Sequence, residues 1–318
     1  MAIHNGEMKV FIGSANPELG ESICKELGIK PAKSEVIRFN EGNTMVRLLE
    51  NVRGRDCFII QGISYPVNDN FVELLFWINA LKLASAAQVT AIIPFFSYAK
   101  GDKKDEPRVS IRARVCADAI EAAGADRIVT MDLHSPQIEG FFKIPVDHLY
   151  ARPVIADYFK SKKLSNLVVA SADVGFGKTA YKFADHLKTS TVIGNKIRKD
   201  HSEKAKVWSV VGDVKDKDVL IVDDIVFSGG TLVSMANAVK ALGAKSIFAA
   251  VTHGVFSKGA SQKIGNSPII EMVTTDTVEH HFGEPLKNLV KLSTAVIVAK
   301  AIESIHEYQS VSALENNE

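Results

Sequence analysis

The stretch VLIVDDIVFSGGTLVSMANAVKALGA, residues 219–244, combines the features that decide the fold of this chain. Residues 219–222 are all apolar, which predicts a buried strand. Residues 231–242 have the apolar spacing of a helix, and Gly243 is suited to the left-handed position that follows a helix. A further β-branched run at residues 247–251 completes the pattern, so the stretch predicts a strand–helix–strand unit with parallel strands.

The link between this strand and this helix carries two acids and a glycine turn. In open parallel sheets, ligands bind beyond the carboxyl ends of the strands. Gly229 and Gly230 allow close backbone approach, and the N–H groups of Ser228–Thr231 lie at a helix N-terminus, which favours a phosphate. Asp223 and Asp224 would repel a phosphate placed directly on them, but they can accept hydrogen bonds from sugar hydroxyls, and a nearby Mg²⁺ would lower the repulsion. The link therefore predicts a sugar-phosphate site.

Short runs rich in β-branched residues recur along the whole chain, with helical patterns at Asn68–Ala87 and Arg112–Ala123. In the second helix Val115, Ala119, Ile120 and Ala123 form the predicted buried stripe, and Gly124 ends it. Alternating strands and helices predict an α/β fold with mostly parallel sheets. The predicted strands lie in MKVFIGS (8–14), SEVIRF (34–39), DCFIIQG (56–62), VTAIIPFF (89–96), RIVTMDLH (127–134), NLVVASAD (166–173), STVIGNKI (190–197), DVLIVDDI (218–225) and KSIFAAVTHG (245–254).

The strand–helix pattern runs twice, with a joint near Asp147–Pro153, which predicts two domains, residues 1–150 and 151–318. The tail from Leu289 onward reads as a strand and then a helix. The sequence leaves open that this last helix packs back on the first domain.

Composition bounds the partners of the chain. Its 318 residues include 38 Lys plus Arg and 37 Asp plus Glu, a formal net charge of +1, which argues against a nucleic-acid partner. No apolar stretch reaches about 18 residues, and no signal peptide pattern is present, so we expect no membrane partner and a cytoplasmic location. Cys24, Cys57 and Cys116 are scattered and have no metal-ligand spacing, which predicts buried thiols.

Residues 223–231 resemble the phosphoribosyl-pyrophosphate (PRPP) loop of type I phosphoribosyltransferases, and nearly the whole chain resembles the ribose-phosphate pyrophosphokinase family. The first half is similar to the bacterial-type first class and several later motifs to the plant-type second class. The resemblance implies two tandem type I phosphoribosyltransferase-like domains, with ATP at the first and ribose 5-phosphate at the second. The matching segments are LENVRGRDCFIIQ (49–61), NDNFVELL (68–75), AIIPFFSYAKGD (91–102), RIVTMDLHSPQIEGFF (127–142) and THGVFS (252–257).

The activity that the resemblance implies is Mg²⁺-dependent transfer of the pyrophosphoryl group of ATP to the anomeric hydroxyl of ribose 5-phosphate, in a homodimer or hexamer. It implies a mobile cationic loop with Lys196 and Arg198 as catalytic residues, and His134 and Asp173 as metal ligands. The nucleotide would contact Phe39, Glu41, Asn43, Lys100 and Gly101. Ribose 5-phosphate would contact Asp223, Asp224, Phe227, Ser228, Gly229, Gly230 and Thr231.

Several of these segments have a different interpretation from their residues alone. A histidine at a strand end, like His134, is more often a structural hydrogen-bonding residue, and Asp132 either orients its ring or ends the strand. Residues 177–179, Gly-Lys-Thr, look like the end of a P-loop, but such a loop needs glycine at position 172, where this chain has Ala172. The charged segment 194–206 is by itself typical of a solvated hairpin loop.

Several positions depart from the family pattern, and three of them bear on whether the chain is active. Asn43 and Gly101 replace residues that commonly meet the nucleotide, and Phe227 replaces a carboxylate that contacts the ribose. These departures leave open a catalytically inactive regulatory homologue. A phosphoribosyltransferase that consumes PRPP would need only one such domain, and a DNA-binding PRPP sensor would need a helix-turn-helix and a basic face, which do not appear in the sequence.

Overall fold

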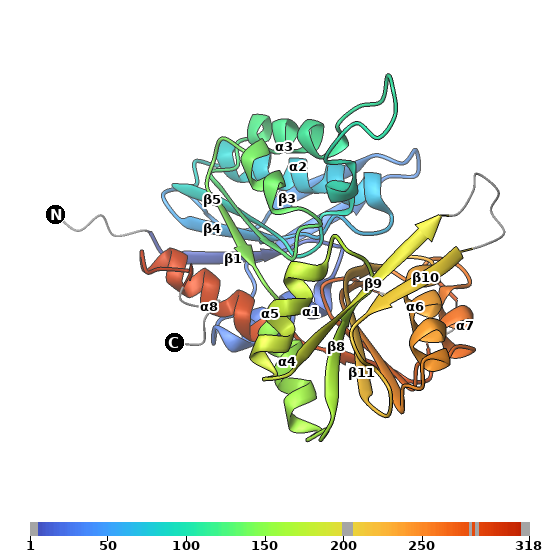
Figure 1. Ribbon diagram of the computed structural model, residues 1–318. Coiled ribbons are helices and arrows are strands. Elements are labelled where there is room, and N and C mark those ends of the chain that lie inside the picture. Colours follow the sequence, from blue (N-terminus) through green and yellow to red (C-terminus); the bar gives the residue numbers. More distant parts are fainter. Residues whose placement is uncertain (1–5, 199–205, 280–281, 284–285, 313–318) are drawn as a thin grey trace. The chain divides into compact units, whose positions relative to one another are not determined.

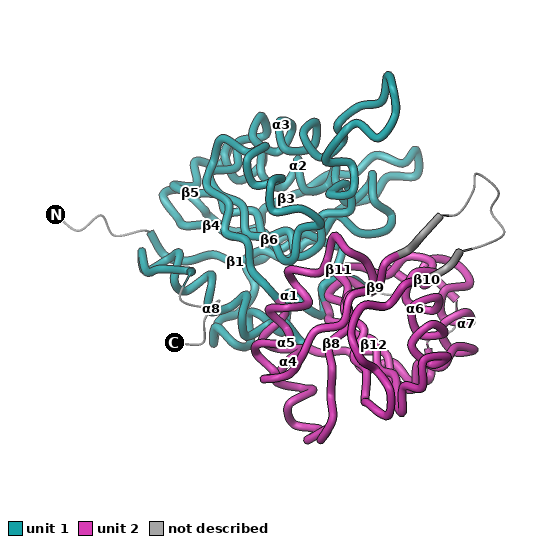
Figure 2. The backbone as a smooth tube through the Cα atoms, viewed as in Figure 1, with its two compact units in different colours: residues 1–150, 277–279, 293–318 teal, residues 151–276, 280–292 magenta. Residues whose placement is uncertain are grey.

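The computed structural model describes residues 6–198, 206–279, 282–283 and 286–312, with the backbone alone for residues 196–198 and 206–208. The chain divides into two compact units, coloured separately in Figure 2. Unit 1 comprises residues 1–150, 277–279 and 293–318, and unit 2 comprises residues 151–276 and 280–292. The last helix, α8 (Ala295–His306), therefore belongs to unit 1 although it follows unit 2 in the chain.

Unit 1 is built on a five-stranded sheet in which every neighbouring pair of strands is parallel. Helices α1 (Pro17–Glu26) and α8 pack together on one face, and α2 (Val67–Leu83) and α3 (Arg112–Ala123) cover the other (Figure 1). A two-stranded hairpin of β2 (Ser34–Arg38) and β3 (Thr44–Leu48) packs on α2. The sheet order is β1 (Met8–Ile12), β4 (Asp56–Ile60), β5 (Gln88–Ile93), β6 (Arg127–Met131) and β7 (Val146–Leu149).

Unit 2 is built on a seven-stranded sheet that is parallel except for its first pair. Helices α4 (Arg152–Ser161) and α5 (Gly177–His186) lie on one face, and α6 (Gly230–Ala241) and α7 (Ala260–Gly265) lie on the other (Figure 1). The sheet order is β10 (Lys206–Val211), β9 (Ser190–Arg198), β8 (Leu167–Ser171), β11 (Asp218–Val226), β12 (Ser246–Gly254), β13 (Glu271–Thr275) and β14 (Leu289–Leu292).

The predicted α/β fold with mostly parallel sheets is confirmed, and each of the nine predicted strand segments contains a strand. The predicted bounds of α3 are also correct, but of its predicted buried stripe only Ile120 is fully buried. Val115 is 59% exposed, whereas the buried positions are Ala113, Cys116, Ala117 and Ile120. Both sets have helical spacing, and small alanines on several faces gave the sequence little contrast between them.

The end of α8 is fixed to the sheet of unit 1 by a buried carboxylate. His306 Nδ1 lies 2.8 Å from Asp56 Oδ2 at the start of β4, and the Asp56 side chain is only 1% exposed. Burial raises the pKa of Asp56, and the hydrogen bond and charge of His306 oppose that rise. The contact joins residues 250 positions apart and anchors the C-terminal helix to the sheet.

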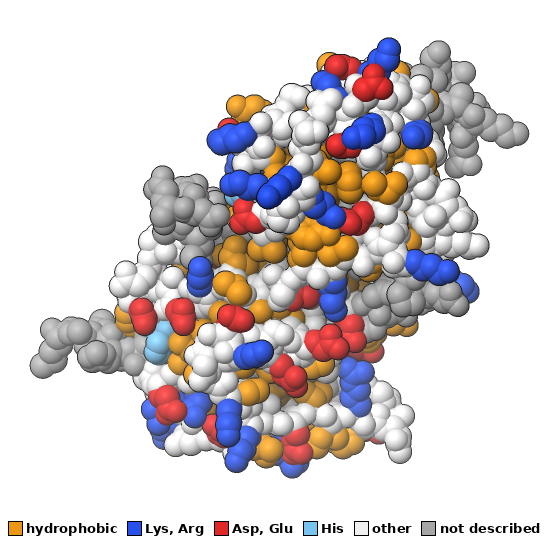
Figure 3. Space-filling view, turned by 90° about the horizontal axis from the view of Figure 1, so that it is seen from below, with side chains coloured by type: hydrophobic (Ala, Val, Ile, Leu, Met, Phe, Trp, Pro, Cys, Tyr) orange, Lys and Arg blue, Asp and Glu red, His pale blue; other side chains and the backbone are white. Residues whose placement is uncertain are grey.

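The chemical character of the interior and the surface agrees with the composition. Cys24, Cys57 and Cys116 are buried free thiols, as predicted, and burial raises the pKa of Cys57 to about 12. Within the described ranges, no helix combines the length and the apolar character needed to cross a membrane. On the face seen in Figure 3, basic and acidic side chains are interspersed, with hydrophobic side chains between them.

Candidate functional site

Asp223 and Asp224 lie inside a strand, at a step in the sheet of unit 2. The prediction that the strand ends at Val222 was wrong, because β11 continues to Val226. On one side β8 pairs with β11 only as far as Val222, while on the other side β12 keeps pairing up to Val226. The two acids are therefore held by regular strand geometry beyond the point where β8 has ended, at the carboxyl edge of the sheet.

The third acid of this edge, Asp173, follows the end of β8. Its Oδ1 accepts a hydrogen bond of 2.8 Å from the Phe176 N–H, in the turn before α5. Burial raises the pKa of Asp223 well above its ordinary value, and the charges of Asp224 and then Asp173 raise it further. The Asp224 N–H donates to Asp223 Oδ1 at 3.0 Å and partly opposes this rise. Hydroxyl donors or a cation would therefore stabilise the ionised acids here.

The glycine turn that follows opens into helix α6, which begins at Gly230, one residue before the predicted start. Gly229 has φ of +70°, and a Cβ at this position would lie 2.8 Å from Ile264 Cγ1, so only glycine fits without strain. The Val233 N–H donates to the Gly229 carbonyl at 3.0 Å and closes the first helical turn. The N–H groups before Val233 then lie at the helix N-terminus, where partial positive charge favours an anion.

The candidate sugar-phosphate residues thus come together on one edge of unit 2. Asp223 and Asp224 lie in β11, and Phe227–Thr231 form the turn and the start of α6. Ser228 and Thr231 are exposed, and Ser228 Oγ is 3.4 Å from the Gly230 nitrogen, whose N–H it accepts. The arrangement provides acids for hydroxyl groups and main-chain donors for a phosphate within a few residues of each other.

The catalytic candidates Lys196 and Arg198 lie on strand β9, where the backbone of Arg198 pairs with that of Lys206 on β10. The interpretation of residues 194–206 as a loop was therefore wrong for residues 194–198 and for Lys206, which belong to the paired strands β9 and β10. The side chains of Lys196 and Arg198 lie outside the described part of the structure.

In unit 1, the nucleotide candidates Phe39, Glu41 and Asn43 form the tip of the β2–β3 hairpin. The Phe39 N–H donates to the Asn43 carbonyl at 2.8 Å, and Gly42 has φ of +93°. Phe39 is 43% exposed, so its ring is available to a ligand or to another chain. The hairpin presents these residues on a short projection.

Lys100 and Gly101 lie in a short 3-10 helix, η1 (Ser97–Gly101), after the carboxyl end of β5. A Cβ on Gly101 would lie 2.6 Å from the Nε atom of Arg112, the first residue of α3. Arg112 is exposed and forms no ion pair or side-chain hydrogen bond within the described residues. The absence of a side chain at Gly101 thus makes room for the Arg112 guanidinium next to the residue that follows Lys100. The sequence patterns did not identify Arg112 as a candidate.

His134 lies in the turn after β6, in unit 1, and is exposed. Asp173 belongs to unit 2, so the two predicted metal ligands come from different units. Considering only the residues that the structure describes, no three His, Cys, Asp or Glu side chains are close enough together to hold a metal ion. The turn that carries His134 is itself held by His148, which the sequence patterns also missed.

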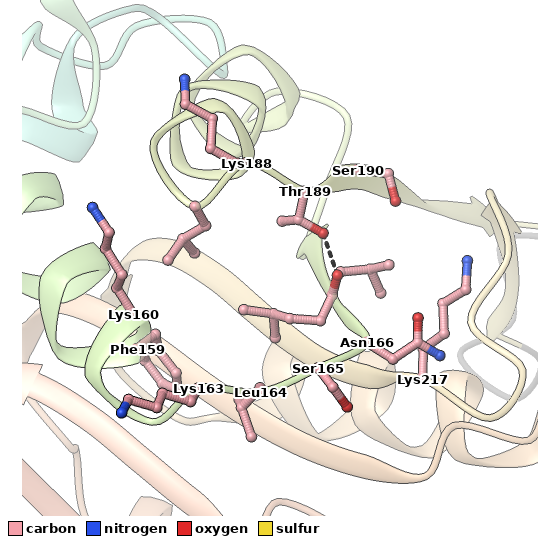
Figure 4. A pocket seen from close by; sticks show the side chains of 13 residues that line it. Phe159, Lys160, Lys163, Leu164, Ser165, Asn166, Lys188, Thr189, Ser190 and Lys217 are labelled. Atoms are coloured by element: carbon pink, nitrogen blue, oxygen red, sulfur yellow. Dashed lines mark hydrogen bonds between the residues drawn. The ribbon is translucent and has the colours of Figure 1, made fainter.

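A cavity of about 330 Å³ lies at the opposite, amino edge of the unit 2 sheet, between the starts of β8 and β9. It is lined by Lys160, Lys163, Lys188 and Lys217, whose amino ends point outward from its centre in Figure 4. Lys217 pairs with Asp213 at 3.1 Å, and Lys188 pairs with Asp185 at 3.7 Å. Ligands of parallel sheets bind at the carboxyl edge, so this cavity is separate from the candidate site.

Comparison with known proteins identifies the family. Residues 8–124 match the N-terminal domain of ribose phosphate pyrophosphokinase, and residues 186–315 match the phosphoribosyl synthetase-associated domain. The chain is 43% identical over 317 residues to a ribose-phosphate pyrophosphokinase of Clostridium perfringens, covering 99% of both chains. The chain belongs to the ribose-phosphate pyrophosphokinase family.

Further ribose-phosphate pyrophosphokinases agree with this assignment in sequence and in fold. The Bacillus subtilis protein is 40% identical over 307 residues, which cover 96% of each chain. The crystal structure of phosphoribosylpyrophosphate synthetase from Mycobacterium smegmatis superposes with a TM-score of 0.89 at 37% identity, covering 95% of this chain and 99% of that one. The family resemblance inferred from the sequence is therefore confirmed over the full length.

Proposed function

We propose that this chain transfers the pyrophosphoryl group of ATP to the anomeric hydroxyl of ribose 5-phosphate, producing PRPP and AMP for nucleotide biosynthesis. The observation that carries the proposal is the continuous match to ribose-phosphate pyrophosphokinases over 99% of both chains. In this reaction the anomeric oxygen forms a bond to the β-phosphorus of ATP, the bond from that phosphorus to the oxygen bridging to the α-phosphate breaks, and the hydroxyl proton is lost.

Ribose 5-phosphate binds, in this proposal, at the carboxyl edge of unit 2. The turn Phe227–Thr231 and the N-terminus of α6 hold the phosphate through main-chain N–H groups and the hydroxyls of Ser228 and Thr231. Asp223 and Asp224 accept hydrogen bonds from the ribose hydroxyls. Burial and then the charges of Asp224 and Asp173 raise the pKa of Asp223 in the free protein, and hydroxyl donors would oppose this rise by stabilising the ionised form.

ATP binds, in this proposal, at unit 1. The hairpin residues Phe39, Glu41 and Asn43 contact the adenine end, and Lys100 and Gly101 adjoin the triphosphate. Arg112, which lies against Gly101, adds a second cation to this region. Lys100 alone would lack the planar, bidentate geometry of a guanidinium, and Arg112 supplies that geometry.

Mg²⁺ is the proposed metal, with His134 and Asp173 as the protein ligands. Mg²⁺ is usually held by one or two protein groups together with substrate phosphates, so a site with few protein ligands suits it. The carboxylates of Asp173, Asp223 and Asp224 also provide the oxygen-rich, negatively charged surroundings that this ion prefers. When bound, the ion would neutralise charge on the ATP phosphates.

Transfer of this kind depends mainly on positioning and on neutralising charge. Lys196 and Arg198, from the β9–β10 pair, are the proposed cations that stabilise charge in the transition state and exclude water. If these cations engage only when both substrates are bound, ATP is protected from hydrolysis.

We also propose a cytoplasmic homo-oligomer, a dimer or a hexamer. Along α2, Leu74, Trp77 and Ile78 are buried, whereas Phe76 is 42% and Leu83 is 79% exposed. The exposed apolar side chains on this helix suit a contact with another copy of the chain. Light scattering coupled to gel filtration gives the mass of the assembly, and a mass of one chain at micromolar concentration would contradict this part of the proposal.

The activity is tested by measuring AMP release with ATP, Mg²⁺ and ribose 5-phosphate, together with PRPP formation. We expect equal amounts of AMP and PRPP, and no AMP when the sugar is omitted. The alternative, an inactive regulatory homologue carrying Asn43, Gly101 and Phe227, predicts binding of the substrates without either product.

A further inference from the structure

The turn after β6 is held by the neighbouring strand β7 at two successive backbone positions. Asp132 adopts a left-handed conformation with φ of +38°, and its N–H donates to the Leu149 carbonyl at 2.9 Å. The next N–H, that of Leu133, donates to His148 Nε2 at 2.9 Å. His134 is the residue that follows, so the anchored turn places this residue.

The imidazole of His148 is itself held by contacts with Glu139 and Tyr150. Its side chain is 4% exposed, and its Nδ1 lies 2.7 Å from Glu139 Oε1, in the 3-10 helix η2 (Pro136–Phe141). The ring of Tyr150 lies against it, with the ring centroids 4.5 Å apart and the planes tilted by 32°, and the Tyr150 hydroxyl lies 3.4 Å from Nδ1. Strand pairing places His148 opposite Thr130 of β6, which brings the imidazole alongside the turn.

The hydrogen-bond partners of His148 determine its tautomer. Leu133 offers a donor to Nε2, so Nε2 must carry a lone pair. The carboxylate of Glu139 accepts, so Nδ1 must carry the proton. A neutral His148 with its proton on Nδ1 therefore bridges the start of the turn, at Leu133, to its end, at Glu139.

From this bridge we infer that His148 is a positioning residue for the nucleotide–metal site, because it holds the turn Leu133–Glu139 in the conformation that presents His134. The inference rests on the proposed function, in which His134 serves Mg²⁺ bound to ATP. It assigns His148 no contact with the substrates. Its effect is confined to one element of unit 1 and leaves the ribose 5-phosphate residues of unit 2 unchanged.

Two substitutions separate the hydrogen bond that the ring makes with Leu133 from the one that it makes with Glu139. In His148→Gln the amide oxygen reaches the place of Nε2 and keeps an acceptor for the Leu133 N–H. In His148→Asn the shorter amide reaches only the place of Nδ1, keeps the bond to Glu139 and leaves the Leu133 donor without its partner. His186→Asn is the matched control, because His186 also pairs with an acid, Asp157 at 3.0 Å, but lies in unit 2.

The first readout is hydrogen exchange of the Leu133 amide in the free protein. We expect exchange at least tenfold faster in His148→Asn than in the unsubstituted protein, and nearly unchanged in His148→Gln and His186→Asn. The second readout is steady-state kinetics, where His148→Asn raises KM for Mg²⁺-ATP about tenfold and leaves KM for ribose 5-phosphate unchanged, because one buried hydrogen bond is lost.

The inference is overturned if Leu133 exchanges at the same rate in His148→Asn as in the unsubstituted protein, or if both KM values rise together, which indicates general destabilisation. If His148→Asn does not fold, His148→Gln decides instead. The inference requires that the Leu133 amide of His148→Gln exchange as slowly as in the unsubstituted protein, and faster exchange would overturn it. Failure of the proposed function has a different signature, because the unsubstituted protein would then release no AMP.

Discussion

The carboxyl edges of the two sheets have similar backbone arrangements and contrasting chemistry. At the edge of unit 2, Asp173, Asp223 and Asp224 concentrate negative charge next to a helix N-terminus. At the edge of unit 1, His134, Lys100 and Arg112 provide an imidazole and two cations. In the proposed function, parallel sheets of the same kind serve a polyhydroxylated sugar at one edge and a triphosphate at the other, because the residues just after the strands are free to differ.

The largest expected change is a loss of kcat on substitution in the β9–β10 pair. This pair belongs to unit 2, but its cations are proposed to act on the phosphates of ATP. Lys196→Ala should lower kcat about 100- to 1000-fold, the usual loss when one transition-state donor is removed. The affinity for ribose 5-phosphate, measured by calorimetry, should change little. Lys188→Ala, at the amino edge of the same sheet, is the control and should keep normal turnover. Unchanged kcat in Lys196→Ala would remove this residue from the mechanism.

The second effect concerns the acids of unit 2. Asp223→Asn should weaken ribose 5-phosphate binding about 10- to 100-fold, because a charged acceptor for a hydroxyl is lost. Calorimetric titration with the sugar phosphate measures this change. Equal affinity in the two proteins would show that Asp223 does not contact the ribose.

The same substitution should stabilise the free protein, with a definite dependence on pH. The pKa of Asp223 is higher in the folded protein than in the unfolded chain, where an Asp has a pKa of about 3.9. Below about pH 3.9 the protonated carboxyl is present in both states and contributes its full stability to the fold, and this contribution is lost as the pH rises through the raised pKa. The Tm gain of Asp223→Asn should therefore be absent below about pH 3.9 and grow above it. Asp213→Asn is the control, because the hydrogen bond with Lys217 lowers the pKa of Asp213 instead of raising it. This substitution should give no gain in Tm.

The third effect tests the cations of unit 1. Arg112→Ala should raise KM for ATP about tenfold without changing KM for ribose 5-phosphate, since a charge-assisted hydrogen bond to a phosphate is lost. Arg114→Ala is the matched control on the same helix, because Arg114 already pairs with Asp118 at 2.7 Å. Equal KM values for ATP in both variants would place the triphosphate away from Arg112.

The smallest effect concerns the glycine turn of unit 2. Gly229 and Gly259 both precede helices and have φ of +70° and +84°, but only Gly229 has a neighbour, Ile264, in the space of a Cβ. Gly229→Ala should lower the free energy of unfolding by about 1 kcal/mol more than Gly259→Ala, which carries the backbone strain alone. Denaturant titration measures both, and equal losses would show that Ile264 moves aside without cost.

The sequence predicted most strands of both sheets because they are short, β-branched and flanked by glycine or polar residues, as in residues 56–62 and 245–254, but it did not predict β7, β10 or β13. It misplaced the end of β11, because acids are unusual inside a strand and Asp223 looked like the start of a loop. Only the three-dimensional pairing with β12 reveals that the strand continues. The β9–β10 pairing escaped notice for the same reason, since charged residues there resemble a solvated loop.

The candidate site was predicted where chemistry lies within one stretch of sequence, as in residues 223–231. It could not be predicted where a contact joins separate segments. Arg112 lies 11 residues from Gly101, and its side chain occupies the space that a Cβ at position 101 would need. His148 touches Leu133 across a strand pair, which no local pattern records.

The fate of the β-phosphorus of ATP tests the central claim most directly, because it distinguishes pyrophosphoryl transfer from every simpler phosphate transfer. The chain is incubated with Mg²⁺, ribose 5-phosphate and ATP carrying radioactive phosphorus at the β-position, and the products are separated. The account predicts that the label appears in PRPP and that the nucleotide product is unlabelled AMP. Label retained in ADP, or released as free pyrophosphate without PRPP, would contradict it.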